Sequence, residues 1–331
     1  MQEVKSVRDA DVKGKRVLIR VDFNVPLDMT RGEPHIADDS RIRATLPTIE
    51  LLQEHKVAQI ILIAHLGRPG GKVVESLRLA PVEKRFRELT GNAPNVSFLE
   101  NVRFDPREEA NDEMFAKELA QHGDIFVNEA FADSHRAHAS IVGIPKFLPS
   151  YAGLHLLEEI EKLSHALAPQ KPALAIVGGD KLETKLTLIE KLSPLYDKVF
   201  VGGALANAMA ESRGNIIVPA DGVPQKKGMF DIGPATSETW AHEIKNAKFV
   251  LWNGPVGWYE KGYNKATDVL AQALVDSGVE AVIGGGDTAA ALAKFSFDPR
   301  KVFISTGGGA MLQFLVEGTL PGIEALKNSK L

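Results

Sequence analysis

Glycines that follow short apolar segments form the pattern of this 331-residue chain that most directly indicates chemistry. The second half contains five such segments: ALAIVGGDK, KVFVGGA, FVLWNGP, AVIGGGDT and VFISTGGGA. Because glycine has no Cβ, its backbone N–H approaches a phosphate closely, and a helix that begins directly afterwards adds the positive end of its dipole. Each glycine group alone is also typical of an ordinary turn between a strand and a helix. Five in one half of the chain predict a phosphate-binding, nucleotide-type site.

Charged residues beside these glycines support a phosphate ligand. Lys181 and Lys185 follow the first glycine pair, four residues apart at the start of a predicted helix. A cation is unfavourable at that end of a helix unless an anion binds there. Asp287 stands directly behind three glycines, and one carboxylate is enough to anchor Mg²⁺ that phosphate oxygens and water also hold. An aspartate at this place is equally typical of a helix N-cap, so both interpretations stay open.

The first half places different side chains at or near the ends of its predicted strands: Asp22, Asn24, Arg41, His65, Arg68, Arg103 and Arg136. The planar guanidinium group of arginine binds carboxylate or phosphate through two parallel hydrogen bonds, so four arginines predict a small, strongly anionic ligand. A metal role for His65 is the least favoured, since no second histidine or carboxylate stands at ligand spacing. Asp133, Ser134 and His135 are adjacent in sequence and therefore do not indicate a hydrolase triad.

Alternation of short apolar strands with helical patterns predicts the elements that position these residues. In the first half, strands are expected at 16–21, 59–64, 96–99 and 125–127. This order is typical of a parallel sheet with helices on both faces, and such sheets bind ligands beyond the carboxyl ends of their strands. Residues 154–167 have apolar side chains at steps of three and four, which predicts a helix that ends before two prolines. We expect this helix to connect two domains and to permit hinge bending.

Composition and missing motifs exclude several classes of protein. A hydrophobic fraction of 44% and a net charge of -4 are typical of a globular protein that binds neither nucleic acid nor membranes. The absence of cysteine excludes disulfides and thiolate metal sites, and with no apolar leader at the N-terminus it leads us to expect a cytoplasmic protein. No P-loop spacing is present. Gly284-x-Gly286-x-x-Ala289 matches the dinucleotide fingerprint, but the next strand ends in Ser305 and Thr306 rather than in an acidic residue.

An ordered set of motifs resembles the phosphoglycerate kinase family over nearly the whole chain. The motifs are RVDFNVP, DSRIRATLPTI, HLGRP, LENVRF, SHRAHAS, GGDKLETK, DIGPAT, WNGPVGWYE, GGGDT and STGGGA. The resemblance implies a monomer of two Rossmann-like domains that close on a hinge. Residues 1–152, with the tail 318–331 packed back on them, would bind 3-phosphoglycerate or 1,3-bisphosphoglycerate. Residues 153–317, beginning with the interdomain helix, would bind ADP or ATP with Mg²⁺.

The resemblance also implies roles for individual residues. The glycerate side would consist of Asp22, Asn24, Arg41, His65, Arg68, Arg103 and Arg136. The nucleotide side would consist of Gly179, Lys181, Lys185, Gly203, Asn253, Pro255, Glu260, Gly285, Gly286, Asp287 and Thr288, with Asp287 as the metal ligand. Phosphoryl transfer from an acyl phosphate to ADP needs no general base, because the attacking oxygen is already ionised. Charge stabilisation would therefore come from Arg41, Lys185 and the amides of Gly307, Gly308 and Gly309.

The chain is shorter than is usual for this family, with gaps near residues 90–98 and 210–228. The second gap borders the expected adenine pocket. Two alternatives to an active glycolytic kinase therefore stay open. One is a ligand-binding or regulatory protein that has lost catalysis, and the other is an NAD-dependent dehydrogenase that uses the glycines at 284 and 286.

Overall fold

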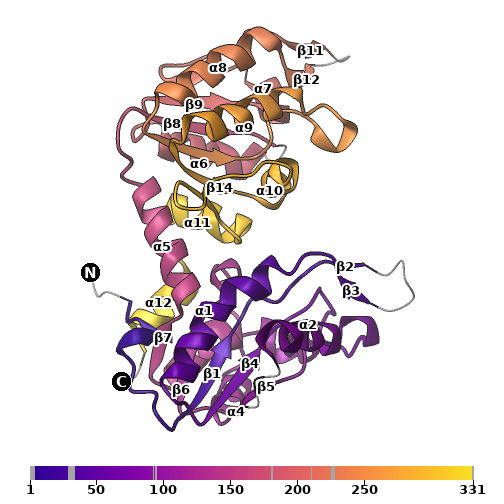
Figure 1. Cartoon of the computed structure of the whole chain (residues 1–331), viewed down its shortest axis with the longest axis vertical. Helices are drawn as coiled ribbons and strands as arrows, with labels where there is room; N and C mark the ends of the chain where they lie inside the picture. The colour runs from indigo at the N-terminus through magenta and orange to yellow at the C-terminus, as the bar shows by residue number, and fades with distance from the viewer. Residues whose placement is uncertain are drawn as a thin grey trace. The chain divides into compact units, whose positions relative to one another are not determined.

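The computed structural model describes residues 4–28, 34–91, 93, 95–179, 182–209, 211–224 and 228–329. The chain divides into two compact units (Figure 1): Met1–Ile160 together with Thr319–Leu331, and Glu161–Gly318. Within the described part of the chain, no helix is both long and apolar enough to cross a membrane.

The first unit is built on a parallel sheet with the strand order β5-β4-β1-β6-β7. Its strands are β1 (Arg16–Arg20), β4 (Gln59–Ile63), β5 (Val96–Phe98), β6 (Ile125–Asn128) and β7 (Ser150–Ala152). The strands predicted for this half are confirmed to within one residue at their ends. They are recognisable because a parallel strand is covered on both faces and so has an unbroken apolar sequence.

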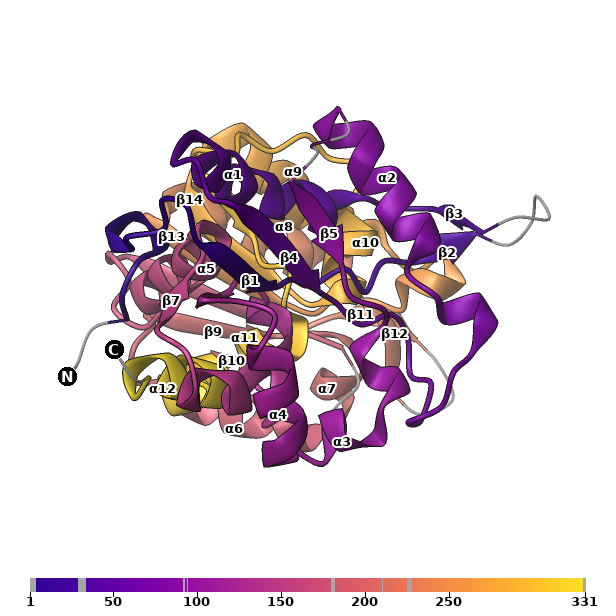
Figure 2. The same cartoon turned by 90° about the horizontal axis from the view of Figure 1, so that it is seen from below.

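Helices cover both faces of this sheet. They are α1 (Ser40–Glu54), α2 (Ala80–Thr90), α3 (Pro106–Glu109), α4 (Glu113–Ala120) and α12 (Pro321–Lys327). Figure 2 shows α1 and α2 on one side of the sheet and α4 and α12 on the other. The short strands β2 (Leu27–Asp28) and β3 (His35–Ile36) pair antiparallel. The C-terminal helix α12 belongs to this unit, where the Gly322 N–H donates to the Ser134 carbonyl oxygen at 2.8 Å.

The second unit has a parallel sheet with the order β10-β9-β8-β13-β14-β15. Its strands are β8 (Ala173–Val177), β9 (Lys198–Val201), β10 (Ile216–Ile217), β13 (Phe249–Asn253), β14 (Glu280–Gly284) and β15 (Val302–Ile304). The helices are α6 (Leu182–Leu192), α7 (Gly203–Ala208), α8 (Pro234–Asn246), α9 (Lys265–Ser277), α10 (Gly286–Leu292) and α11 (Gly308–Glu317). The strands β11 (Gly222–Pro224) and β12 (Met229–Ile232) form an antiparallel pair. The fold is therefore two parallel α/β units, as predicted.

The helix α5 (Leu154–Ala166) begins in the first unit and continues in the second, since the division falls after Ile160. Its observed range agrees with the prediction to one residue. Its first N–H groups are bound by side chains of the first unit: the Leu154 N–H donates to Thr48 Oγ1 at 2.9 Å, and the Leu156 N–H donates to Glu129 Oε2 at 3.3 Å. These bonds satisfy N–H groups that have no partner inside a helix.

Candidate functional site

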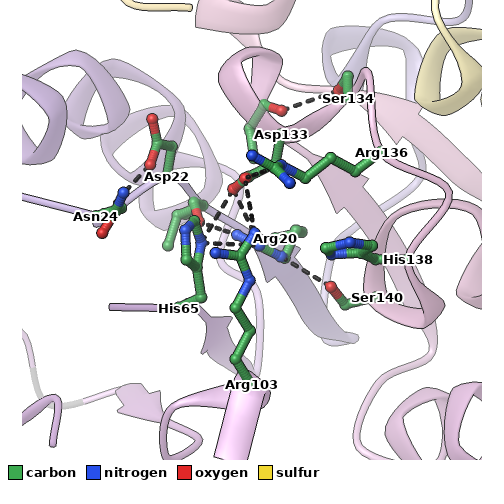
Figure 3. A network of polar contacts seen from close by, with 12 residues as sticks. Arg20, Asp22, Asn24, His65, Arg103, Asp133, Ser134, Arg136, His138 and Ser140 are labelled. Atoms are coloured by element: carbon green, nitrogen blue, oxygen red, sulfur yellow. Dashed lines mark hydrogen bonds and ion pairs between the residues drawn. The ribbon is translucent and has the colours of Figure 1, made fainter. Parts of the chain in front are cut away.

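A cluster of charged side chains lies beyond the carboxyl ends of the strands in the first unit (Figure 3). β1 ends at Arg20 and is followed by Asp22 and Asn24, while β4 is followed by His65. The segment after β6 adds Asp133 and, further along, Arg136, His138 and Ser140. The parallel pairing of β1 with β4 and β6 brings these strand ends to one edge of the sheet.

Asp22 and Arg41 form the first ion pair of this cluster. Nη1 of Arg41, on α1, donates to both carboxylate oxygens of Asp22 at 3.0 and 2.7 Å. Burial and the nearby Asp133 carboxylate raise the pKa of Asp22, although Arg41 and His65 oppose this shift. Asn24 is fixed beside the pair, because its Oδ1 accepts the Gly67 N–H at 2.8 Å.

Asp133 is the centre of a second, fully buried group. Its Oδ2 lies 3.0 Å from Arg20 Nη2 and 3.1 Å from His65 Nδ1. Burial alone would raise the pKa of Asp133, but the charges of His65 and Arg20 hold it well below its usual value. Ligand atoms of Asp22, His65 and Asp133 lie within 4.8 Å of one another, a grouping that the sequence spacing did not show. Arg41 and Arg20 already bind the two carboxylates, so the arrangement favours an anionic ligand over a metal ion.

Two arginines of the cluster have buried N–H groups without a hydrogen-bond partner among the described residues, although Glu109 Oε1 forms an ion pair with Arg103 Nε at 3.4 Å. Arg103 is 3% exposed, and its Nε and Nη2 have no hydrogen-bond partner among the described residues. The Nε of Arg136 is likewise buried without such a partner in the described part of the chain. Burial lowers the pKa of Arg103, because a charged group is less stable away from water. Arg68 is exposed after β4. Buried guanidinium groups with unsatisfied donors are the arrangement expected of an anion site.

In the second unit, β8 and β13 end in glycines that pack against each other. A Cβ on Gly178 would lie 2.7 Å from the Gly254 carbonyl oxygen and would also collide with the Pro255 carbonyl oxygen, so no other residue fits. Gly254 has a φ of +101°, which favours glycine. Lys185, on α6, is buried and donates to the Asn253 backbone oxygen at 3.1 Å and to the Asn253 side chain. Its ammonium group therefore lies at the end of β13.

The N-termini of α10 and α11 meet at this place. A Cβ on Gly308 would lie 3.1 Å from the Gly285 Cα, so the two helix starts are in backbone contact. Gly307 precedes α11 as its N-cap residue. A cavity of about 160 Å³ lies here and is lined by Gly178, Gly179, Lys185, Asn253, Gly254, Pro255, Gly285, Gly286, Asp287, Thr288, Gly308, Gly309 and Leu312. Two helix N-termini and one lysine make it suitable for phosphate groups.

A second cavity, of about 400 Å³, shares Gly179, Pro255 and Asp287 with the first. Its lining includes three aromatic side chains and consists, besides the shared residues, of Gly203, Ala204, Asn207, Met229, Phe230, Gly257, Trp258, Tyr259 and Glu260. Trp258 Nε1 donates to Glu260 Oε2 at 3.2 Å. A flat aromatic group joined to phosphates would fit the two adjoining cavities. Lys181, which the sequence also assigned to this site, lies outside the described residues.

A third cavity, of about 720 Å³, lies apart from both the arginine cluster and the glycine-lined cavities. It is lined by residues of β3, α1 and α2, including Asp39, Arg43, Arg85 and Glu88. These four side chains are paired with one another through ion pairs of 2.8 Å. These four charges therefore already compensate one another.

Most of the predicted residues that the structure describes lie in these two clusters, and three neighbouring residues were left out of the site by the sequence interpretation. These are Arg20, Asp133 and His138. A charged residue inside an apolar strand was the available signal for Arg20, because a buried cation requires a partner. No comparable signal identified Asp133, whose partners are distant in sequence.

Comparisons with known proteins agree on one family. The family model described as phosphoglycerate kinase matches residues 7–99, 91–217 and 211–318. The phosphoglycerate kinase of Pelotomaculum thermopropionicum is 38% identical over 392 aligned positions, which cover 97% of this chain and 98% of that protein. That of Herpetosiphon aurantiacus is 39% identical over 394 positions, covering 98% of this chain and 99% of the relative. Both alignments are longer than the 331-residue chain, so these relatives have segments that it lacks.

Solved structures give the same result. The phosphoglycerate kinase from Coxiella burnetii superposes with a TM-score of 0.85 at 33% identity, covering 99% of this chain and all of that one. The phosphoglycerate kinase from Pyrococcus horikoshii has a TM-score of 0.83 at 26% identity, with 97% and 98% of the two chains covered.

Proposed function

The chain belongs to the phosphoglycerate kinase family, and we propose that its cationic cluster binds the glycerate ligand while its glycine-lined cavities bind the nucleotide. Members of this family are phosphotransferases that move a phosphoryl group reversibly between 1,3-bisphosphoglycerate and ADP, a step of glycolysis. The observation that carries the proposal is the different construction of the two clusters. One presents arginines with unsatisfied N–H groups, and the other presents helix N-termini and one lysine.

On the glycerate side, we propose that Arg103 and Arg136 bind the ligand through their unsatisfied N–H groups. Arg41 would join them, held in place by Asp22. The remaining predicted contacts are Asn24, His65 and Arg68. Residues 1–152 and the tail 318–331 would form the glycerate-binding domain, and residues 153–317 the nucleotide-binding domain. We expect a cytoplasmic monomer, in keeping with a glycolytic role.

On the nucleotide side, the base would occupy the cavity of about 400 Å³ and the phosphates the adjoining one. Glu260, which lines the cavity of about 400 Å³, would accept hydrogen bonds from the ribose. Asp287 is exposed at the wall that both cavities share, and its single carboxylate fits Mg²⁺, which takes most of its ligands from phosphate and water. When bound, Mg²⁺ would neutralise part of the phosphate charge. Of the shared lining, Gly179 and Pro255 would contact the junction of ribose and phosphates.

Catalysis in this proposal consists of alignment and neutralisation of charge. The attacking phosphate oxygen of ADP is already ionised, so no residue has to remove a proton. The amides at Gly307, Gly308 and Gly309, together with Lys185 and Arg41, would stabilise the negative charge of the transferring group. Direct transfer requires the two ligands to meet, so we propose that the two units close over α5 and exclude water from the acyl phosphate.

A coupled assay of ATP formation from 1,3-bisphosphoglycerate and ADP tests this function. We expect Asp287→Ala to lower kcat/KM for ADP on the order of 100-fold, and Arg136→Ala to act mainly on the glycerate side. Asp298→Ala and Arg300→Ala are matched controls, since these two residues form an exposed ion pair of 2.7 Å in the second unit. Folded protein without turnover would refute the proposal, and interchanged effects of the two site variants would refute the assignment of ligands to units.

A further inference from the structure

Asp133 is a buried carboxylate in the middle of a cluster that is proposed to bind an anion. It is 4% exposed, and its partners Arg20 and His65 are 0% and 2% exposed. Figure 3 shows its carboxylate facing the side chains of Arg20, His65, Arg103 and Arg136. A negative charge at this place opposes the binding of an anion, so its presence requires an explanation.

The two carboxylate oxygens of Asp133 have different surroundings. Oδ2 is bound closely, at 3.0 Å from Arg20 Nη2 and 3.1 Å from His65 Nδ1. Oδ1 lies 3.7 Å from Arg103 Nη2 and 4.0 Å from Arg136 Nε, too far for hydrogen bonds. Asp133 therefore compensates part of the charge of Arg103 and Arg136 without forming a hydrogen bond to either, while Glu109 Oε1, 3.4 Å from Arg103 Nε, also pairs with Arg103.

Arg20 does not depend on Asp133 for its position. Its Nε donates to Ser140 Oγ at 2.9 Å, and its Nη1 donates to the Val21 carbonyl oxygen. Ser140 is in turn fixed by Glu108, which accepts from its Oγ at 2.5 Å and from its N–H at 2.9 Å. Since these bonds hold the guanidinium group from the other side, the contribution specific to Asp133 is its charge.

We propose that Asp133 is an internal counter-ion that compensates the buried cations before the ligand binds and so sets a lower affinity for anions. This inference rests on the proposed function of the cluster as the glycerate site. If Asp133 were neutral, the empty site would lose the carboxylate that pairs with Arg20 and lies beside Arg103 and Arg136, and removing one partner of a buried ion pair is strongly destabilising. When the anionic ligand binds, it supplies a second negative charge, and repulsion from Asp133 weakens its binding and favours its release. Asp133 is in these terms a positioning and affinity-setting residue, not a catalytic one.

The test compares Asp133→Asn with Asp124→Asn in the whole protein. Asp124 pairs with Arg16 at 2.7 Å at the opposite end of β1, so both variants lose one negative charge from an aspartate–arginine pair. Calorimetry at constant ionic strength measures binding of 3-phosphoglycerate, inorganic phosphate and ADP. Repulsion between like charges a few Å apart stays substantial at an effective dielectric of about 20, so we expect Asp133→Asn to bind 3-phosphoglycerate at least about tenfold more tightly. Asp124→Asn should be unchanged, and ADP affinity should be the same in all three proteins.

Thermal unfolding and steady-state kinetics supply a second measurement. In buffer without phosphate, Asp133→Asn should unfold at a lower temperature than the original protein, and inorganic phosphate should raise its unfolding temperature more. KM for 3-phosphoglycerate should fall while KM for the nucleotide stays constant. A merely structural role would lower stability without increasing anion affinity.

The outcomes distinguish a failure of the proposed glycerate-binding function from a failure of the counter-ion role of Asp133. If the original protein binds neither 3-phosphoglycerate nor phosphate, the proposed function fails. If it binds them, and Asp133→Asn binds them equally or more weakly while ADP binding is intact, the counter-ion role is wrong. Asp133→Ser is measured in parallel with Asp133→Asn. If both variants fold only when phosphate is present, the counter-ion role is supported. If they fail to fold even with phosphate, the counter-ion role is wrong.

Discussion

Glu129 joins the end of β6 to the start of α5, and its ionisation provides a quantitative test of how this junction is built. It is 1% exposed, and its Oε1 accepts from Thr48 Oγ1 at 2.5 Å and from the His155 N–H at 3.2 Å. Burial raises the pKa of Glu129 to about 8, although these hydrogen bonds oppose the shift. The unfolded chain should titrate near the ordinary value of 4.5. Between these two values the folded protein binds one proton more than the unfolded chain.

The sign of the effect follows from this difference. Protonated Glu129 stabilises the fold fully below about pH 4.5, and this stability is lost as the pH rises through about 8. With these two pKa values, the contribution falls by about 2–3 kcal/mol between pH 6 and pH 9. Glu129→Gln keeps the shape and removes the titration. We therefore expect the free energy of unfolding of Glu129→Gln, relative to the original protein, to increase by about that amount over the same range.

Denaturant unfolding at four pH values from 6 to 9 measures this difference. Other buried acids, such as Asp231, whose pKa burial raises to about 6, are present in both proteins and cancel in the comparison. Glu113→Gln, an exposed substitution on α4, is the control and should give a difference that does not change with pH. A difference for Glu129→Gln that is equally flat would show that Glu129 is ionised in the folded protein, and the argument from burial would be wrong.

Two further predictions concern the nucleotide side. Gly178→Ala should lower nucleotide affinity more than tenfold and reduce the free energy of unfolding by about 1–3 kcal/mol, because the added Cβ would collide with the Pro255 backbone. The Cβ added by Gly286→Ala would meet no neighbouring atom within 4 Å, so this variant should leave stability unchanged. Denaturant unfolding and calorimetry check both, and equal stability of the two variants would contradict the steric argument. Trp258 lines the cavity of about 400 Å³ and is 47% exposed, while the other two tryptophans are buried. Binding of ADP should therefore change the fluorescence of Trp258, and Trp258→Phe should remove that change without abolishing binding. Calorimetric binding of ADP without any change in fluorescence would place the base elsewhere.

The strands and their ends could be predicted because burial on both faces leaves a plain sequence signature. β8, with the sequence ALAIV and every residue buried, is an example, and the glycines that follow it mark the edge of the sheet at which we propose the nucleotide binds. The pairing of Arg20 with Asp133 could not be predicted in this way, since the two residues are 113 positions apart. Only the register of β1 with β6, in which Arg20 is opposite Asn128, brings them together. Short strands such as β10 and β11 also lack a periodic pattern and depend on tertiary pairing.

The two clusters would neutralise the negative charge of their proposed ligands by different means, and this difference bears on how the reaction should respond to pH. The N-termini of α10 and α11 act through backbone N–H groups, which do not titrate and cannot rotate away. The other cluster depends on guanidinium groups, which stay charged at any pH at which the protein is folded. Its His138 does not add to that charge, because burial and the neighbouring Arg103 lower its pKa to about 4, so the ring is neutral near pH 7. In the proposed mechanism no general base is needed, so the arginines and backbone N–H groups would supply a charge that does not change near neutral pH, and Asp133 would set how strongly the arginine cluster holds its ligand.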